Sequence, residues 1–190
     1  MSTFERGFKV WCERYSTDIR RTLGAGPEAP LNTRALARHL GVEVWSPHDV
    51  PGLDADTLAI LLRNDGKTPS CWSAVTVVVG KKVVVILNSS HSPARQASDL
   101  THELAHRIRG HAAQEIDVTE EGILLLRSYD KMLEEEADWL SGCLLLPRDA
   151  LLHIRRQGLS DEEAAARYGV STRMLTYRVA RTGVARQVAY

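Results

Sequence analysis

Residues 92–110 read SPARQASDLTHELAHRIRG, a pattern typical of one helix with a start signal and a stop signal. Ser92 is a favoured N-cap residue, a proline follows in the first turn, and Gly110 is typical of a C-terminal cap. Because successive helical residues turn by about 100°, His102 and His106 lie one turn apart on the same face. Two imidazoles at this spacing can bind one metal ion. The pattern therefore predicts a metal site with Glu103 as a neighbouring general base.

A catalytic zinc site needs a third protein ligand and an open position for water. One arrangement places a glycine three residues and a histidine six residues after the second histidine, but these positions hold Arg109 and Ala112. The other arrangement takes a glutamate from a second helix, which we expect over residues 130–146. Glu134 and Asp138 lie one turn apart on that helix. We therefore expect Glu134 to be the third ligand.

The apolar stripe of this second helix predicts how its acidic side chains are oriented. The stripe consists of Leu133, Ala137, Leu140 and Leu144. Glu134 and Asp138 border it, so they should face partly inward. A half-buried carboxylate pair is costly without cationic partners, and metal binding by Glu134 would meet that need. Asp138 would accept the ring N–H of a ligating histidine. Glu135 and Glu136 fit a solvated face, with Glu136 as the reserve candidate for the third ligand.

Two further side chains are candidates for contacts with a substrate or with a developing oxyanion. Stabilising an oxyanion usually takes a donor in addition to the metal. His111 follows the expected end of the first helix, and Tyr129 precedes the second. The alternative interpretation of His111 is an ordinary surface histidine.

The composition is that of a globular protein. The chain has 190 residues, of which 44% are apolar and 25% charged, and its formal net charge is zero. This length suits one domain with a small appendage, and the balanced charge does not indicate a nucleic-acid binder. The apolar runs are too short for a membrane span, and the N-terminus lacks the apolar core of a signal peptide. Cys12, Cys71 and Cys143 are odd in number and widely spaced, so we expect free thiols in a cytoplasmic protein.

The remaining patterns predict an α+β fold that is mainly helical and has a small sheet. The predicted elements are helices over residues 4–23, 33–40 and 54–62, a strand over 42–45, and a hairpin of strands over 74–79 and 83–87. Thr33 can cap the second of these helices. The hairpin is nearly continuous in apolar residues, so both of its faces should be covered, and its edge is the natural place for a substrate peptide to add as a strand. Residues 111–128 show little periodicity.

Residues 165–175 resemble a helix-turn-helix, in which Gly169 makes the turn and Ser171 caps the second helix. The candidate phosphate contacts on that second helix are Arg173, Tyr177, Arg178 and Arg181. The alternative is that these helices pack on the core of the protein. We favour this alternative because base-contacting side chains such as asparagine are scarce on the second helix.

Three stretches together resemble a known family. They are HELAH at residues 102–106, EEEADWL at residues 134–140 and LLLP at residues 144–147. In this order and spacing they resemble the ImmA/IrrE family of bacterial and phage metallopeptidases over about residues 42–147. An alanine replaces the family's usual glycine between the two histidines, and residues 98–101 lack its common Phe-Thr. Neither change removes a ligand.

The resemblance implies a zincin-like metallopeptidase core of gluzincin type over residues 1–150 and a helix-turn-helix-like segment over residues 151–190. It implies one Zn²⁺ as cofactor, although Mn²⁺ or Fe²⁺ would also suit the ligands. It further implies a site-specific endopeptidase that cleaves a partner repressor of helix-turn-helix type, relieving repression under stress or in a mobile element. Two alternatives stay open: a DNA-binding regulator with a structural metal, and a module of toxin–antitoxin type that binds its partner without cutting it. Direct DNA binding and the oligomeric state are left open by the sequence.

Overall fold

The computed structural model describes residues 4–66, 70, 72–80, 82–111, 116–118, 124–126 and 130–187. Helices predominate and a small sheet accompanies them, so the predicted α+β class is confirmed. The helices are α1 (Phe8–Thr22), α2 (Thr33–His39), α3 (Ala55–Leu61), α4 (Pro93–Arg109), α5 (Lys131–Leu145), α6 (Arg148–Arg156), α7 (Asp161–Tyr168) and α8 (Thr172–Thr182), with short 3-10 turns η1 (Pro47–Asp49) and η2 (Val184–Arg186). The strands are β1 (Val42–Trp45), β2 (Ala74–Val79), β3 (Lys82–Leu87), β4 (Ile116–Val118) and β5 (Leu124–Leu126).

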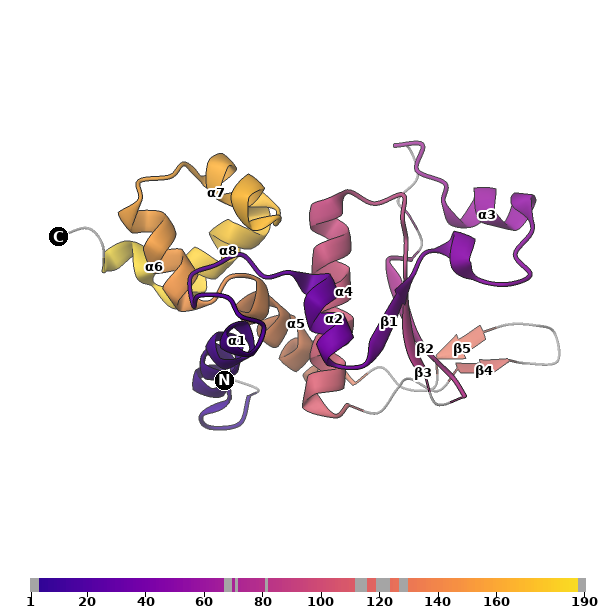
Figure 1. Cartoon of the computed structure of the whole chain (residues 1–190), viewed down its shortest axis with the longest axis horizontal. Helices are drawn as coiled ribbons and strands as arrows, with labels where there is room; N and C mark the ends of the chain where they lie inside the picture. The colour runs from indigo at the N-terminus through magenta and orange to yellow at the C-terminus, as the bar shows by residue number, and fades with distance from the viewer. Residues whose placement is uncertain are drawn as a thin grey trace.

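The helix that carries HELAH stands in the middle of the molecule. Figure 1 shows α4 with the larger sheet on one side and α5 and α1 on the other, while α6, α7 and α8 gather beyond α5 toward the C-terminus. α4 contacts β2, β3 and α5 directly. A residue on α4 can therefore meet side chains from both the sheet and the glutamate-bearing helix.

The larger sheet has the order β1-β3-β2, with β1 parallel and β2 antiparallel to β3. The two central residues Val84 and Val85 point to opposite faces of β3 and are both buried, so both faces of this strand are covered, as predicted. β2 differs, because Val78 is 60% exposed. Among the described strands, β2 pairs with β3 alone and so lies at an edge.

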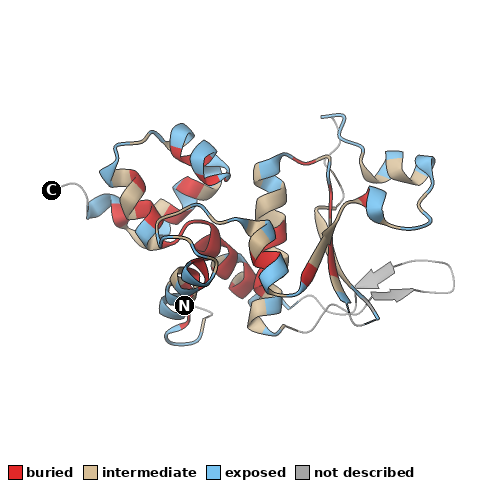
Figure 2. Cartoon of the chain, viewed as in Figure 1, coloured by how far each residue is buried: buried red, intermediate tan, exposed pale blue. Residues whose placement is uncertain are grey.

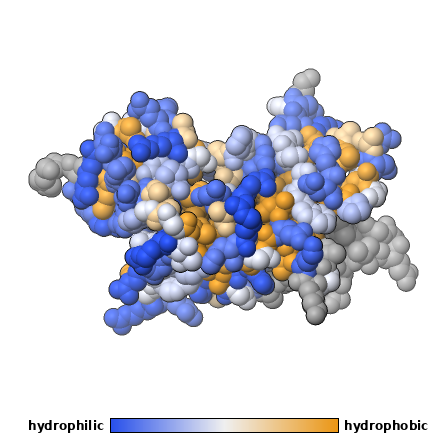
Figure 3. Space-filling model, viewed as in Figure 1, coloured by the Kyte–Doolittle hydropathy of each residue, from blue (hydrophilic) through white to orange (hydrophobic). Residues whose placement is uncertain are grey.

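Two hydrophobic clusters meet within α5. The first contains residues of α1, α2, the larger sheet, α4 and most of α5, and the second contains the end of α5 and the helices that follow. Leu144 belongs to the first cluster and its neighbour Leu145 to the second. Figure 2 shows α5 as mainly buried between these parts. Figure 3 shows a mostly hydrophilic face with separate groups of apolar residues.

Arg178 lies in the interior, where it joins α8 to the end of α5. It is fully buried, its Nε donates to the Leu146 carbonyl at 3.1 Å, and its Nη2 pairs with Glu13 Oε1 at 2.6 Å. The last carbonyls of a helix have no partner within the helix, so a buried helix end needs donors from elsewhere. The expected phosphate contact is therefore wrong for Arg178. Arg173, Tyr177 and Arg181 are exposed.

Several local expectations can be compared with the structure. Asn32, and not Thr33, caps α2, since its side chain accepts from the Ala35 N–H at 2.9 Å. Gly169 has a φ of 63° and the Ser171 side chain caps α8, as the turn and cap predict. Cys12 and Cys143 are free and buried, while the third cysteine lies outside the described residues.

β4 and β5 form a small antiparallel pair that the weak periodicity of their segment did not predict. None of the described helices combines the length and the apolar character needed to cross a bilayer.

Candidate metal centre

Local sequence signals position the two helices that build the site. The Ser92 side chain caps α4 and Gly110 ends it with a φ of 70°, as predicted. Asp130 caps α5 by accepting from the Met132 N–H at 2.9 Å. Where α4 and α5 pack together, Ala105 and Ala137 are both fully buried. These small side chains allow the two helix backbones to approach closely.

His102, His106 and Glu134 come together between α4 and α5, as the sequence predicts. The two histidine Nε2 atoms lie 3.0 Å apart. Glu134 Oε2 lies 3.2 Å from His102 Nε2, and Glu134 Oε1 lies 3.5 Å from His106 Nε2. Zinc bonds of about 2.0–2.2 Å at tetrahedral angles separate neighbouring donor atoms by about 3.4 Å. The donor types and their separations therefore fit a single metal ion of this kind.

Asp138 contacts the other nitrogen of His102, as predicted, since its Oδ1 lies 3.0 Å from His102 Nδ1. Its side chain is 73% exposed, however, whereas that of Glu134 is 19% exposed. The expectation of two half-buried carboxylates is thus wrong for Asp138. Glu134 and Asp138 lie one turn apart on α5, so Glu134 is inside the interface with α4 and Asp138 is at the solvent-exposed edge of that interface.

Glu136 is buried and does not lie on a solvated face. Its Oε2 lies 2.7 Å from Arg109 Nη2 and 3.4 Å from His111 Nε2. Its carboxylate therefore pairs with Arg109 and His111 and not with the His102 and His106 rings, which removes it as the reserve third ligand. Glu135 pairs with Lys131 at 3.8 Å near the surface.

His111 contacts His106 on the side of the ring opposite His102 and Glu134. Its side chain is 5% exposed, and its Nδ1 lies 2.9 Å from His106 Nδ1. Because both ring nitrogens already face protein groups, His111 has no nitrogen left for a substrate or an oxyanion, so that expectation is wrong. Tyr129, the other candidate for such a contact, lies outside the described residues.

Glu103 is held from the sheet side. Thr76 on β2 donates its hydroxyl to Glu103 Oε2. Burial raises the pKa of Glu103 above its ordinary value, and the Thr76 hydrogen bond only partly opposes this. Sequence reasoning did not identify Thr76. Its signal was a lone hydroxyl in the otherwise apolar run AVTVVV.

The two rings have different electrostatic environments. Burial alone would lower the pKa of His102, but the hydrogen bond with Asp138 and two nearby carboxylates raise it above its ordinary value. Burial and the adjacent His102 ring lower the pKa of His106. A neutral imidazole is the form that binds a metal ion, and the environment of His106 favours that form.

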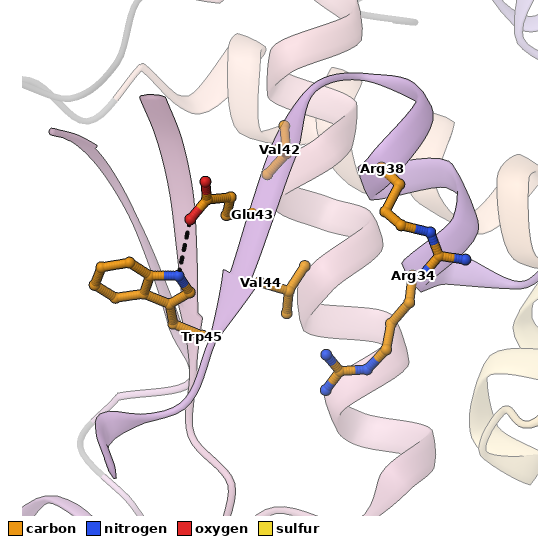
Figure 4. Close-up of a pocket in the computed structure, with 6 residues that line it drawn as sticks. All are labelled: Arg34, Arg38, Val42, Glu43, Val44 and Trp45. Atoms are coloured by element: carbon orange, nitrogen blue, oxygen red, sulfur yellow. Dashed lines mark hydrogen bonds between the residues drawn. The ribbon is translucent and has the colours of Figure 1, made fainter. Parts of the chain in front are cut away.

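A separate pocket lies at the opposite edge of the larger sheet. It has a volume of about 330 Å³ and is lined by Arg34 and Arg38 of α2 and by the four residues of β1. Figure 4 shows the residues of β1 on one side of this space and the two arginine side chains of α2 on the other. His102, His106 and Glu134 are not among its lining residues.

Comparison with known proteins identifies a family whose matched region contains the site. A family model of peptidases, M78, described as the IrrE N-terminal-like domain, matches residues 63–180, more than half of the chain. The match spans α4 and α5, and therefore includes all three grouped donors. No curated protein matches the chain. On the family match and the donor set together, the chain belongs to the IrrE N-terminal-like family of peptidases.

Proposed function

We propose that this chain is a zinc-dependent, site-specific endopeptidase that cleaves a partner repressor of helix-turn-helix type. The observation that carries the proposal is the grouping of His102, His106 and Glu134 within metal-binding distance of one another. Glu103 lies next to this group and is fixed by a hydrogen bond from β2. Two imidazoles and one carboxylate around an open position are the ligand set of a catalytic zinc, and Mn²⁺ or Fe²⁺ are the other ions that such donors accept.

The residues would divide the work of peptide hydrolysis. When bound, the metal would supply a Lewis acid for the scissile carbonyl and lower the pKa of water at the site. Glu103 would accept a proton from the attacking water and deliver it to the leaving amine. Its raised pKa suits that role, because a base works best when its pKa approaches the operating pH. Asp138 would keep the proton of His102 on Nδ1 and so leave Nε2 as the ligand.

The edge of β2 is the best candidate for substrate binding. Thr76, which contacts the base, belongs to this edge strand, and Val78 lies on the same face two residues further on. An extended peptide that paired with β2 would therefore run past Glu103. Val78 is exposed and would offer it an apolar contact. We therefore expect the repressor to present an extended segment at this edge.

The repressor as substrate rests on the resemblance to ImmA/IrrE proteases. The cytoplasmic setting rests on the odd number and wide spacing of the cysteines. The test is to incubate the zinc-loaded chain with the helix-turn-helix regulator encoded beside it. We expect two specific fragments, which a chelator abolishes and added zinc restores. The matched control is Glu103→Gln, which should keep its zinc and lose cleavage. Cleavage at an undiminished rate by Glu103→Gln, or cleavage that persists in chelator, would contradict the proposal.

DNA binding by α8 is a second candidate function. Arg173, Tyr177 and Arg181 are exposed on a helix that follows a helix-turn-helix turn. A gel shift with the operator of the same regulator, repeated over a salt series, tests it. Steep salt dependence that is lost in Arg173→Gln would favour DNA binding, and no shift at low salt would dispose of it.

A further inference from the structure

The turn after α4 brings a third histidine back to the metal centre. Gly110 adopts a φ of 70°, a backbone conformation that glycine adopts far more easily than other residues. The backbone N–H of His111 then donates to the His106 carbonyl at 3.0 Å. The His106 and His111 rings meet edge to face, with centroids 5.0 Å apart. The local fold thus places the His111 ring directly behind a predicted ligand.

The contacts of these rings indicate which nitrogens would carry protons when a metal is bound. His106 Nε2 faces His102 and Glu134, so this nitrogen is the one available to a metal. With Nε2 binding a metal, a neutral His106 ring would carry its proton on Nδ1. His106 Nδ1 lies 2.9 Å from His111 Nδ1, so in this tautomer the His106 Nδ1–H would donate to His111 Nδ1. His111 would then carry its own proton on Nε2, which lies 3.4 Å from Glu136 Oε2. The result is a continuous chain of hydrogen bonds from the Glu136 carboxylate through the His111 ring to His106.

The far end of this chain is fixed by a cation and by aromatic rings. Arg109 donates through Nε and Nη2 to Glu136 Oε2 at 2.8 Å and 2.7 Å. Its guanidinium also lies 5.0 Å from the Phe8 ring centre and 5.2 Å from that of Trp11, both on α1. Glu136 is 8% exposed on its side chain, and a buried carboxylate requires such partners. α1 therefore supports, through Arg109, the chain of hydrogen bonds that ends at His106.

The two ligating rings are supported in different ways. His102 relies on Asp138, whose side chain is 73% exposed, whereas His106 relies on a chain whose two inner members are nearly inaccessible to water. Water can replace an exposed partner such as Asp138, but it cannot easily replace a buried one. Loss of the buried hydrogen bonds to His106 should thus lower metal affinity more than loss of Asp138.

We propose that His111 is a positioning residue that orients His106 for metal binding, with Glu136 and Arg109 holding His111 in turn. The proposal rests on the metal centre of the proposed function. Groups that hydrogen-bond to a metal-binding histidine fix its tautomer and orientation, and their loss typically lowers metal affinity by about 10–100-fold. His111 itself does not touch the metal or the substrate.

The experiment measures zinc affinity by competition with a chromophoric chelator, together with the visible spectrum of the Co²⁺-substituted protein. We expect His111→Leu to bind zinc about 10–100-fold more weakly and to shift the Co²⁺ bands. His111→Gln should recover most of the affinity, because its amide can accept from His106 and donate to Glu136. A purely structural role would not produce this recovery. The matched control is His39→Gln, at an exposed histidine on α2, which should change neither readout.

The outcomes separate the two proposals. If the parent chain binds zinc tightly and His111→Leu binds it equally well with unchanged Co²⁺ bands, the inference about His111 is wrong and the metal centre stands. If the parent chain binds no zinc, the metal centre and the inference both fail. If His111→Leu does not fold, Glu136→Gln takes its place, with the same weakening expected and the same contrary result.

Discussion

Arg178→Met removes a guanidinium from the junction between α8 and the end of α5 while it keeps an apolar stem in place. The substitution leaves the Leu146 carbonyl without that donor and deprives Glu13 of its cation, although Glu13 still accepts the Arg148 N–H at 2.8 Å. Removing one partner of a buried ion pair costs about 3–5 kcal/mol. The Glu13 side chain is 26% exposed, so water can partly compensate its charge. We therefore expect the lower end of that range, about 3 kcal/mol.

The assay is thermal unfolding followed by circular dichroism, with a urea series as a second measure. For a chain of this size each kcal/mol corresponds to about 2–4 °C, so Arg178→Met should melt about 6–12 °C below the parent protein. The matched control is Arg181→Met on the same helix, where an exposed arginine lies over the Tyr177 ring, and it should cost less than about 1 kcal/mol. A melting temperature for Arg178→Met equal to that of the control would refute the structural role and reopen a surface role for Arg178.

Three further predictions concern single positions. Gly110→Ala must adopt a left-handed backbone, so its free energy of unfolding in urea should fall by about 1–2 kcal/mol; no change would mean that the turn relaxes without strain. Thr76→Val removes a hydrogen bond to the charged Glu103, worth about 1.5–3 kcal/mol. We expect kcat to fall about 10–160-fold at unchanged zinc content, with Thr76→Ser close to the parent. Hydrogen bonds from the Ser160 N–H and hydroxyl lower the pKa of Glu163 below its ordinary value of 4.5. Its carboxylate therefore stabilises α7 at pH values above 4.5. This contribution to stability disappears as the pH falls through the pKa of the folded state. Glu163→Gln should accordingly be less stable than the parent at neutral pH and equal to it in acid, and a difference that persists in acid would contradict the assignment.

Local signals allowed much of the fold and the three grouped donors to be predicted. Ser92 and Gly110 correctly predicted the two ends of α4, because helix caps depend on residues adjacent in sequence. His102 and His106 share one helix, so their spacing fixes their relative placement. Glu134 lies on a different helix, yet the apolar stripe of α5 indicated that it faces inward.

The orientation of the remaining acidic residues depended on contacts that are distant in sequence. α5 packs against α1 as well as α4, so Glu136 is buried where a single stripe indicated a solvated face. Its partner Arg109 belongs to α4 and is itself held by α1. Arg178 illustrates the same point, because its carbonyl partner lies 32 positions away and its carboxylate partner 165. Helix amphipathicity alone does not reveal such a second packing surface.

The most direct test of the central claim is X-ray absorption at the zinc edge of the protein loaded with one equivalent of zinc. The account predicts one bound zinc with two imidazole nitrogens and one or two further oxygen donors at about 2.0–2.2 Å, and loss of one oxygen donor and of tight binding in Glu134→Ala. A sulfur ligand, a site with fewer than two imidazoles, or a spectrum unchanged by Glu134→Ala would contradict it.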